Sequence, residues 1–317
     1  MSETPVKELP KLPRVIAVVN QKGGVGKTTT AINLSTALAL EGQRVLLIDV
    51  DPQANTTGGL GFGRDDERLS VYDILLGEAS AKEAILPTEV ENLSLIPGTK
   101  NMIGANVELV SAERREFRLR EALEPLRAEY PFILLDCPPA LDLLTLNALV
   151  ASDGLLVPMQ AEYFALEGIS ELVSTLDKVA AAFNGGLSLE GVLLTMFDDR
   201  TNLSQQVREN LKSFFGDKLF ATTIPRNIRL AEAPSHGKPV ALYDARSRGA
   251  EAYKDLAVEL LKRYGIGPKT APVQPNGRKR LILDDIPAPR PIEGGILDAS
   301  QPKKKKFWKF GKPEAEE

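Results

Sequence analysis

Residues 15–30 read VIAVVNQKGGVGKTTT, and this stretch decides the fold. The apolar run VIAVVN is typical of a buried strand, and helical spacing begins at Thr28. A strand, a glycine-rich loop and a helix, in this order, are what a phosphate-binding loop requires. Glycines at 23, 24 and 26 let backbone N–H groups converge on phosphate oxygens without obstruction by a Cβ atom. We therefore expect a nucleotide phosphate site here rather than a plain turn before a core helix.

Each position of the loop has an expected role. Lys27 would neutralise the β- and γ-phosphates, and the Thr28 hydroxyl would ligate Mg²⁺ at the positive end of the helix. Two letters depart from the ordinary pattern, because Gln21 stands where the first glycine belongs and a second lysine, Lys22, follows it. The expected nucleotide contacts are Lys22, Gly23, Gly24, Val25, Gly26, Lys27, Thr28 and Thr29.

Further apolar runs predict a parallel sheet. Like VIAVVN, they are five to seven residues long, rich in leucine or β-branched residues, and without alternation: VLLIDV (45–50), FILLDC (132–137), GLLVPM (154–159) and VLLTMF (192–197). Stretches with helical spacing lie between and after them, at 28–40, 111–129, 166–182, 203–215 and 249–264. The alternation predicts an α/β fold over 14–265, a mostly parallel twisted sheet flanked by helices on both faces, as in P-loop NTPases.

The composition describes a globular protein with two terminal extensions. Of 317 residues, 43% are hydrophobic and 26% charged, and no window approaches a membrane span, so we expect a cytoplasmic protein. Residues 1–13 are predicted to be a flexible leader. Residues 266–317 hold eight of the 22 prolines and the basic cluster KKKKFWKF (303–310), which predicts a disordered tail. Without the tail the formal charge is about −8, so any nucleic-acid site must be a local patch.

Carboxylates follow two of the predicted strands at the edge where open α/β sheets bind ligands. Asp136 ends FILLDC and is expected to hold Mg²⁺ through water. Asp49 and Asp51 end VLLIDV, and Asp51 lies further into the loop, where it could orient an attacking water. Asp49 is the weaker metal candidate.

Six segments in order resemble the deviant Walker A ATPases, and more closely the ParA/Soj chromosome-partitioning branch. These are KGGVGKTTTAINL, LLIDVDPQANTT, LLDCPP, EYFALEG (162–168), TMFDDRTNLSQQV (195–207) and IPRNIRLAEAPSHGKP (224–239). The resemblance covers about 14–265 and leaves both extensions out.

The resemblance explains the second lysine. It implies that Lys22 reaches across a nucleotide-sandwich homodimer to the phosphates of the other subunit, with Gly23 at the dimer seam. Two facing triphosphates repel each other, and a lysine supplied in trans reduces that repulsion. The same resemblance makes Lys22, Lys27 and Asp51 the catalytic residues, Asp51 positioning the hydrolytic water while Asp136 supports the metal.

Further residues match family positions for adenine and DNA. Met196, Pro225 and Asn227 match the adenine pocket, and Arg200 and Arg229 match positions that bind double-stranded DNA without sequence preference. Each arginine follows a strand end, so both could emerge on one edge of the sheet. A weaker set of three residues is expected to widen the DNA patch: Arg226, Arg208 and Lys212.

The implied function is an ATP- and Mg²⁺-dependent switch that dimerises, binds nucleoid DNA and moves chromosome or plasmid DNA with a ParB-type partner. One alternative is a MinD-like membrane-associated ATPase, since that branch shares the Lys22 loop. A second, the nitrogenase iron-protein branch, needs paired cysteines, and Cys137 is single. A small-molecule kinase of the superfamily is a third. His236 has no histidine or cysteine partner for a metal and is expected to be structural.

Overall fold

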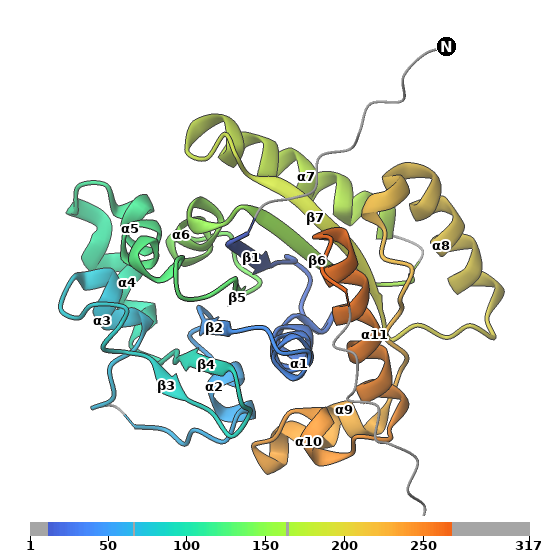
Figure 1. Cartoon of the computed structure of the whole chain (residues 1–317). Coiled ribbons are helices and arrows are strands. Elements are labelled where there is room, and N and C mark those ends of the chain that lie inside the picture. The colour runs from blue at the N-terminus through green and yellow to red at the C-terminus, as the bar shows by residue number, and fades with distance from the viewer. Residues whose placement is uncertain (1–11, 66, 163–164, 268–317) are drawn as a thin grey trace, which may run out of the picture. The chain divides into compact units, whose positions relative to one another are not determined.

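The computed structural model describes residues 12–65, 67–162 and 165–267, and the ribbon is shown in Figure 1. The strands are β1 Arg14–Val18, β2 Val45–Asp49, β3 Leu86–Pro87, β4 Leu93–Ile96, β5 Phe132–Asp136, β6 Gly154–Gln160 and β7 Ser188–Thr195. The α-helices are α1 Lys27–Leu40, α2 Asn55–Gly59, α3 Val71–Leu76, α4 Met102–Glu108, α5 Arg118–Leu123, α6 Leu143–Ala151, α7 Ala165–Ala182, α8 Asn202–Phe215, α9 Ile228–Glu232, α10 Val240–Tyr243 and α11 Arg248–Arg263. Short 3₁₀ helices are η1 Leu109–Ser111, η2 Arg115–Phe117, η3 Glu124–Leu126, η4 Gly216–Lys218 and η5 Ala233–His236.

The seven strands form one sheet in the order β3-β4-β2-β5-β1-β6-β7. All neighbours are parallel except β3, which pairs antiparallel with β4. The register places Asp136 beside Val18 of β1 on one side and beside Asp49 of β2 on the other. The strand ends that carry the phosphate loop and the predicted carboxylates therefore meet at one edge, as expected for a parallel sheet.

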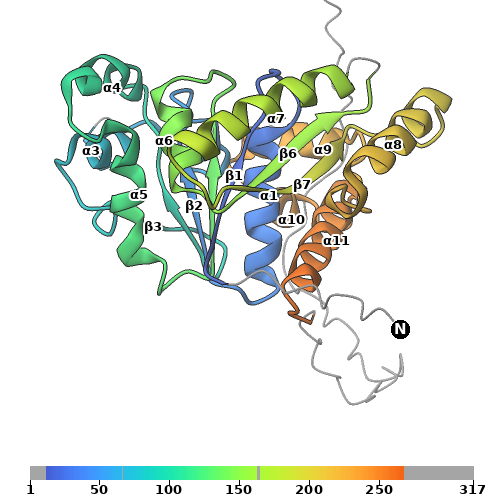
Figure 2. The same ribbon diagram turned by 90° about the horizontal axis from the view of Figure 1, so that it is seen from above.

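Alternate residues of the central strands feed two separate cores. Val15 and Ala17 of β1 face a core with α3 to α8, whereas Ile16 and Val18 face a core with α1, α9 and α11. Figures 1 and 2 show these two groups of helices on opposite sides of the sheet. Burial of both faces explains why the strands lack polar alternation.

The sheet and its flanking helices confirm the predicted fold class, and the structure adds elements that the sequence patterns did not predict. The predicted helix over 111–129 is broken into η2, α5 and η3. Pro125, which lacks an N–H, lies in the first turn of η3 and accounts for the end of α5, and Arg114 just before η2 has a φ of +53°. The strands β3 and β4 were missed, since two and four residues are too few to show a period.

The regular elements run from Arg14 to Arg263, inside the predicted domain. The predicted leader and tail lie outside the described residues except for 12–13 and 266–267. Among the described residues, none of the helices has the length and apolar character needed to cross a bilayer.

Candidate nucleotide site and its surroundings

The glycine-rich loop joins β1 to α1 in the conformation that its sequence predicts. Gly24 and Gly26 have φ of +72° and +89°, in the left-handed region that favours glycine. Gly26 is the N-cap of α1 and has no side chain to satisfy the first N–H groups of the helix. An ideal Cβ atom built on Gly23 or Gly24 meets no heavy atom within 4 Å, so space is open on this side of the loop. The loop thus presents helix N–H groups to an open surface, which is what an anion needs.

Polar side chains at the ends of β6 and β7 hold the loop in place. The Thr195 hydroxyl donates to the Val25 carbonyl at 2.7 Å, and Gln160 Nε2 donates to the Gly24 carbonyl at 3.0 Å. Thr195 is buried, with 2% of its surface exposed. These bonds tie the loop to strands distant in sequence, so the loop conformation depends on the assembled sheet.

Lys27 begins α1 and is 7% exposed. Its Nζ donates to the carbonyl of Lys22 at 3.2 Å. Burial lowers the pKa of Lys27, while the nearby carboxylates of Asp136 and Asp51 act in the opposite direction. The lysine therefore lies in reach of both the loop backbone and the two carboxylates predicted to act on phosphate and metal.

Asp136 ends β5 and is completely buried. Thr56 of α2 donates to its Oδ2 at 2.8 Å. Burial raises the pKa of Asp136 to about 6, against the hydroxyls of Thr56 and Thr28, which favour the charged carboxylate. Its Oδ1 is buried and has no hydrogen-bond partner among the described residues.

An orphaned carboxylate oxygen beside the Thr28 hydroxyl fits a hydrated Mg²⁺ ion. Buried polar atoms are rarely left without a partner, and Mg²⁺ prefers oxygen ligands while keeping several of its waters. Asp136 and Thr28 are thus suited to hold the ion, the former through water, as the sequence predicts. A magnesium ion there would supply charge neutralisation for the phosphate oxygens.

Asp49 ends β2 and points to a different partner. Its Oδ2 accepts from the Thr57 backbone N–H at 2.8 Å and from the Thr57 hydroxyl at 2.7 Å, while Oδ1 accepts from the Asp51 N–H at 3.3 Å. Thr57 in turn accepts from the Gly98 N–H at 3.0 Å. Burial, and next to it the charge of Asp136, raises the pKa of Asp49 to about 8. These contacts favour a structural role for Asp49, which joins α2 to the sheet edge, over the metal role.

Asp51 lies two residues beyond β2 and is 8% exposed. Its Oδ1 accepts from the Gln53 N–H at 2.9 Å, and its carbonyl accepts from the Ala54 N–H at 2.8 Å. Ala54 has a φ of +52°. The tight turn holds the carboxylate close enough to influence the pKa of Lys27.

Lys22 is more exposed than Lys27 and has a partner in its own chain. Its Nζ forms an ion pair with Glu162, which follows β6, and the exposed fractions of the two side chains are 57% and 49%. Its backbone N–H donates to Asn20 Oδ1 at 2.9 Å. The backbone of the loop is therefore held in place at Lys22. Its side chain lies on the surface, paired with the exposed carboxylate of Glu162.

The predicted adenine residues gather beyond the end of β7. Phe197 N donates to the Ile224 carbonyl at 2.9 Å, which brings Met196 and Pro225 onto adjacent segments. Met196 has a φ of +49°, and its sulfur accepts from Gln160 Nε2 at 3.1 Å. Asn227 is the N-cap of α9, where its side chain accepts from the Arg229 N–H at 2.8 Å, so this amide oxygen already has a partner.

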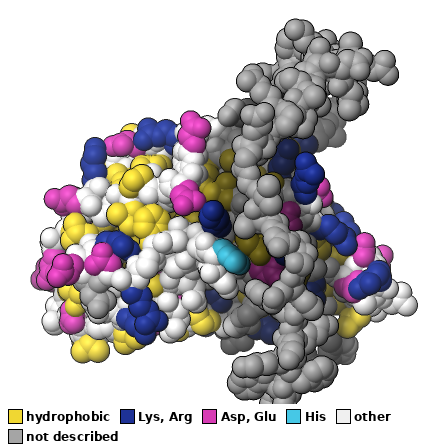
Figure 3. Space-filling model, turned by 90° about the horizontal axis from the view of Figure 1, so that it is seen from below, with side chains coloured by type: hydrophobic (Ala, Val, Ile, Leu, Met, Phe, Trp, Pro, Cys, Tyr) yellow, Lys and Arg dark blue, Asp and Glu magenta, His cyan; other side chains and the backbone are white. Residues whose placement is uncertain are grey.

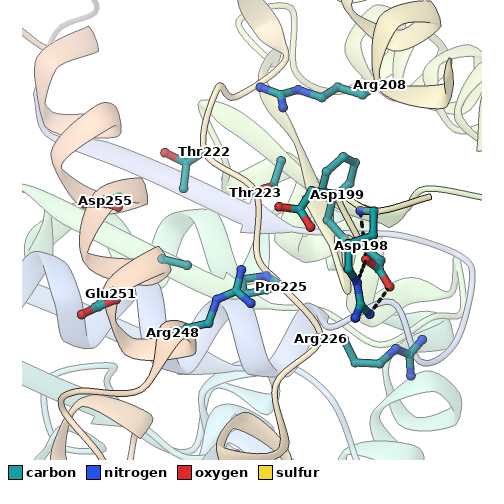
Figure 4. A pocket seen from close by; sticks show the side chains of 13 residues that line it. Asp198, Asp199, Arg208, Thr222, Thr223, Pro225, Arg226, Arg248, Glu251 and Asp255 are labelled. Carbon is teal, nitrogen blue, oxygen red and sulfur yellow. Dashed lines mark hydrogen bonds and ion pairs between the residues drawn. The ribbon is translucent and has the colours of Figure 1, made fainter. Parts of the chain in front are cut away.

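A cavity of about 650 Å³ opens next to Pro225, and Figure 4 shows its lining side chains. It lies between the loops that follow β7 and precede α9 on one side and α8 and α11 on the other. The predicted DNA residue Arg200 lines it, together with Arg208 and Arg226 from the weaker set. Lys212, also from that set, lies on α8 with its Nζ donating to the Gly216 carbonyl at 3.1 Å.

Arg229 does not line this cavity, and the structure gives no contact between Arg200 and Arg229. Arg229 forms ion pairs with Glu232 at 2.8 Å and Asp244 at 3.3 Å. Arg226, three residues before Arg229, lines the same cavity as Arg200.

A second cavity, of about 760 Å³, adjoins the phosphate loop at Thr28 and Thr29. Its other walls come from the segments around α2, the loop after β4 and η5. Four basic side chains and one acidic side chain line it: Arg64, Arg68, Lys100, Lys238 and Asp65. Its position next to α1 makes it part of the surroundings of the phosphates.

Motif reasoning missed several residues that build this site. Thr195 and Glu162 each begin one of the segments that resemble the ParA/Soj branch, and Thr56 and Thr57 lie in LLIDVDPQANTT. Their position in those segments was the only sequence signal that could have identified them. Their hydrogen-bond and ion-pair partners lie in other elements, so the sequence could not show what they bind. The remaining candidates are structural, since Cys137 is buried in the core and His236 stacks on Tyr243 with ring centroids 4.8 Å apart.

Comparison with known proteins places the chain in a family. A family model described as an AAA domain matches residues 13–189. The sporulation initiation inhibitor protein Soj of Bacillus subtilis is 56% identical over 247 residues, which span 78% of this chain and 98% of that protein. The chromosome partitioning protein ParA of Myxococcus xanthus is 52% identical over 250 residues, spanning 79% of this chain and 88% of that protein.

Solved structures share the fold. A Mycobacterium smegmatis protein described as cobyrinic acid a,c-diamide synthase, with bound ATP analog and magnesium, superposes with a TM-score of 0.70 at 36% identity, covering 81% of this chain and 98% of its own. The cell division ATPase MinD of Pyrococcus furiosus gives 0.67 at 29% identity, covering 79% and 99%. Identity above one half over nearly the full length of Soj identifies the branch. The chain belongs to the ParA/Soj family of chromosome-partitioning P-loop ATPases.

Proposed function

We propose that this protein is an ATP- and Mg²⁺-dependent dimerising switch that binds DNA without sequence preference in its ATP state and is released by hydrolysis. The observation that carries the proposal is the convergence of Lys27, Asp51 and Asp136 on a phosphate loop that carries a second lysine, Lys22. The identity to Soj and ParA supports the same assignment.

Hydrolysis in such a site depends on positioning and charge stabilisation rather than on covalent chemistry. Lys27 would exchange its bond to the Lys22 carbonyl for the phosphates, and Thr28 and Asp136 would hold the metal. Asp51, fixed by its turn, would orient the attacking water. The remaining loop contacts to nucleotide would come from the backbone at Gly23, Gly24, Val25, Gly26 and Thr29.

Dimerisation would explain the function of Lys22. The side chain is exposed, and an ion pair of this exposure contributes little to stability, so the lysine can leave Glu162 for the phosphates of a second subunit. Open space over Gly23 and Gly24 gives a second chain room to approach. Met196, Pro225 and Asn227 would contact adenine beside this seam.

DNA would be held through backbone phosphates by Arg200 and Arg229, with Arg226, Arg208 and Lys212 widening the patch. Figure 3 shows basic, acidic and hydrophobic side chains intermingled on one face of the molecule. Weak single contacts on such a surface gain strength when two subunits present them together. A ParB-type protein is the proposed stimulating partner, and the nucleoid in the cytoplasm is the proposed location.

The proposal is tested by DNA binding of the wild type and of Arg200→Glu/Arg229→Glu in ATP, ADP and no nucleotide, over a salt series. We expect the wild type to bind any sequence with ATP alone, and we expect the logarithm of its affinity to fall linearly with the logarithm of the salt concentration. The double variant should dimerise and hydrolyse ATP without binding DNA. A wild type that ignores DNA in every nucleotide state would refute the DNA switch.

A further inference from the structure

Arg200 and Arg229, the two main arginines proposed to bind DNA, differ from nearby Arg226 in their ion pairs. Arg200 and Arg229 are already paired with carboxylates of their own chain, whereas Arg226 forms no ion pair within 4.0 Å with a described residue. All three side chains are exposed. Of the arginines proposed for the DNA patch, Arg200 and Arg229 are thus neutralised by carboxylates in the free protein, whereas Arg226 is not.

Asp198 binds Arg200 through three hydrogen bonds. Its Oδ1 accepts from the Arg200 backbone N–H at 3.1 Å and from Nε at 2.8 Å, and its Oδ2 accepts from a terminal guanidinium nitrogen at 2.7 Å. Both residues line the 650 Å³ cavity, and Figure 4 labels Asp198 and marks its hydrogen bonds by dashed lines. These bonds to Arg200 lower the pKa of Asp198 to about 2, so the carboxylate stays charged at every physiological pH.

The geometry of this pair is the geometry of an arginine on a phosphate. A planar guanidinium presents two parallel N–H donors, and either a carboxylate or a phosphate can accept both of them. Asp198 therefore occupies one of the two donor pairs through which Arg200 could hold a DNA phosphate, and it places a negative charge beside the other. At Arg229 the same role falls to Glu232 and Asp244, which take one guanidinium nitrogen each.

We propose that Asp198 at Arg200, and Glu232 and Asp244 at Arg229, compete with the DNA backbone and limit the affinity of this surface. The proposal rests on the DNA-binding function proposed above. A phosphate that approaches Arg200 must displace Asp198 or bind beside its negative charge. In either case part of the attraction is lost, and DNA remains weakly held and easily released.

The test compares Asp198→Asn with Asp199→Asn. Asp199 lines the same cavity and loses the same charge on substitution, but its carboxylate forms no ion pair with a described arginine. We expect Asp198→Asn to raise ATP-dependent DNA affinity roughly three- to tenfold at low salt and to steepen the salt dependence, because each phosphate gained adds about 0.9 to the slope. Asp199→Asn should change affinity less than twofold and leave the slope unchanged.

Asp244→Asn is a second, independent variant that removes a carboxylate from Arg229 instead of Arg200. It tests the same idea even if Asp198→Asn disturbs the local fold around residue 198. It should raise affinity in the same direction. Equal ATPase rates and melting temperatures verify that both variants fold.

The outcomes separate this inference from the proposed function. If the wild type binds no DNA, the proposed function fails first. If the wild type binds and Arg200→Glu does not, but Asp198→Asn and Asp244→Asn bind like the wild type or like Asp199→Asn, the competitor role is overturned. A fall in affinity for Asp198→Asn also overturns it, since Asp198 would then hold Arg200 in its DNA-binding orientation.

Discussion

At the scale of single residues, the site separates three neighbouring carboxylates by their hydrogen bonds. Asp49 is saturated by Thr57 and the Asp51 N–H, Asp136 keeps one oxygen without a partner, and Asp51 accepts from its own turn. The sequence places all three at one edge and ranks Asp49 below Asp136 as a metal ligand, but it does not show the structural role of Asp49. That distinction depends on which donors α2 brings to them.

Substitution of Asp51 tests the catalytic assignment. We expect Asp51→Ala to lower the ATPase rate roughly 10²- to 10⁴-fold, the range found when a group that positions or deprotonates the nucleophile is removed. ATP binding should persist, and the ATP-bound dimer should accumulate on DNA. Single-turnover hydrolysis and gel filtration with ATP give the two measurements, and hydrolysis at the wild-type rate would exclude this role.

Substitution of Asp49 tests the structural assignment. The pKa of Asp49 is raised from 3.8 to about 8 by burial, so its carboxyl carries a proton near pH 7 and a neutral asparagine is a close replacement. We expect Asp49→Asn to stay within about 1 kcal/mol of the wild-type free energy of unfolding. Asp49→Ala should cost about 1–3 kcal/mol, because the Thr57 donors lose their acceptor in a buried site.

The same pKa predicts the direction of a pH effect. The folded carboxyl binds its proton more tightly than the unfolded one, so the contribution of Asp49 to stability is complete below about pH 4 and is lost as the pH rises through about 8. Urea unfolding of nucleotide-free protein between pH 5.5 and 8.5 should show this loss in the wild type and a smaller one in Asp49→Asn. An identical pH dependence in both proteins would show that Asp49 is ionised throughout.

At the scale of elements, the phosphate loop depends on the far end of β7. The Thr195 hydroxyl satisfies the Val25 carbonyl from a strand that lies 170 positions away in sequence. Thr195→Val keeps the shape and removes the donor, which leaves a buried carbonyl without a partner at a cost of about 1–3 kcal/mol. We expect a lower melting temperature together with weaker ATP binding, measured by calorimetry, and we expect Thr195→Ser to restore both. Normal ATP affinity in Thr195→Val would show that the loop holds its shape without β7.

At the scale of the whole molecule, the second lysine tests whether two chains share the nucleotide. We expect Lys22→Ala to abolish the ATP-dependent dimer seen by light scattering, since the phosphates of each subunit lose a cation from the other. The matched control is Glu162→Ala, which breaks the same ion pair within the chain but leaves the lysine in place. A dimer of normal affinity in Lys22→Ala would contradict the contribution in trans.

The membrane-associated alternative is also decided at this scale. Residues 303–310 are basic and aromatic, which suits anionic lipid as well as nucleic acid. Eight residues followed by glycine and proline make a poor amphipathic helix, so we expect the full chain not to float with anionic liposomes in ATP or ADP. Flotation that depends on ATP would favour a MinD-like role.

The sequence by itself determined the fold class and the position of the site. Unbroken apolar runs predict strands that are buried on both faces of the sheet. The glycines between the first strand and the first helix allow the positive φ angles that the phosphate loop adopts. These features are local, because each depends on residues within about a dozen positions. The same reasoning failed for β3 and β4, which are too short to show a period, and for the helix over 111–129, whose spacing does not reveal the interruption at Pro125.

Only the tertiary structure decided which side chains meet. Thr195 with Val25, Thr56 with Asp136 and Lys22 with Glu162 are pairs separated by 80 to 170 positions, and no local pattern encodes them. The pairing of Asp198 with Arg200 is local in sequence, and the tertiary structure decides only that it lies beside a cavity completed by α8 and α11. Hydrogen bonds and burial depend on distances between elements, and those distances exist only once the sheet has assembled.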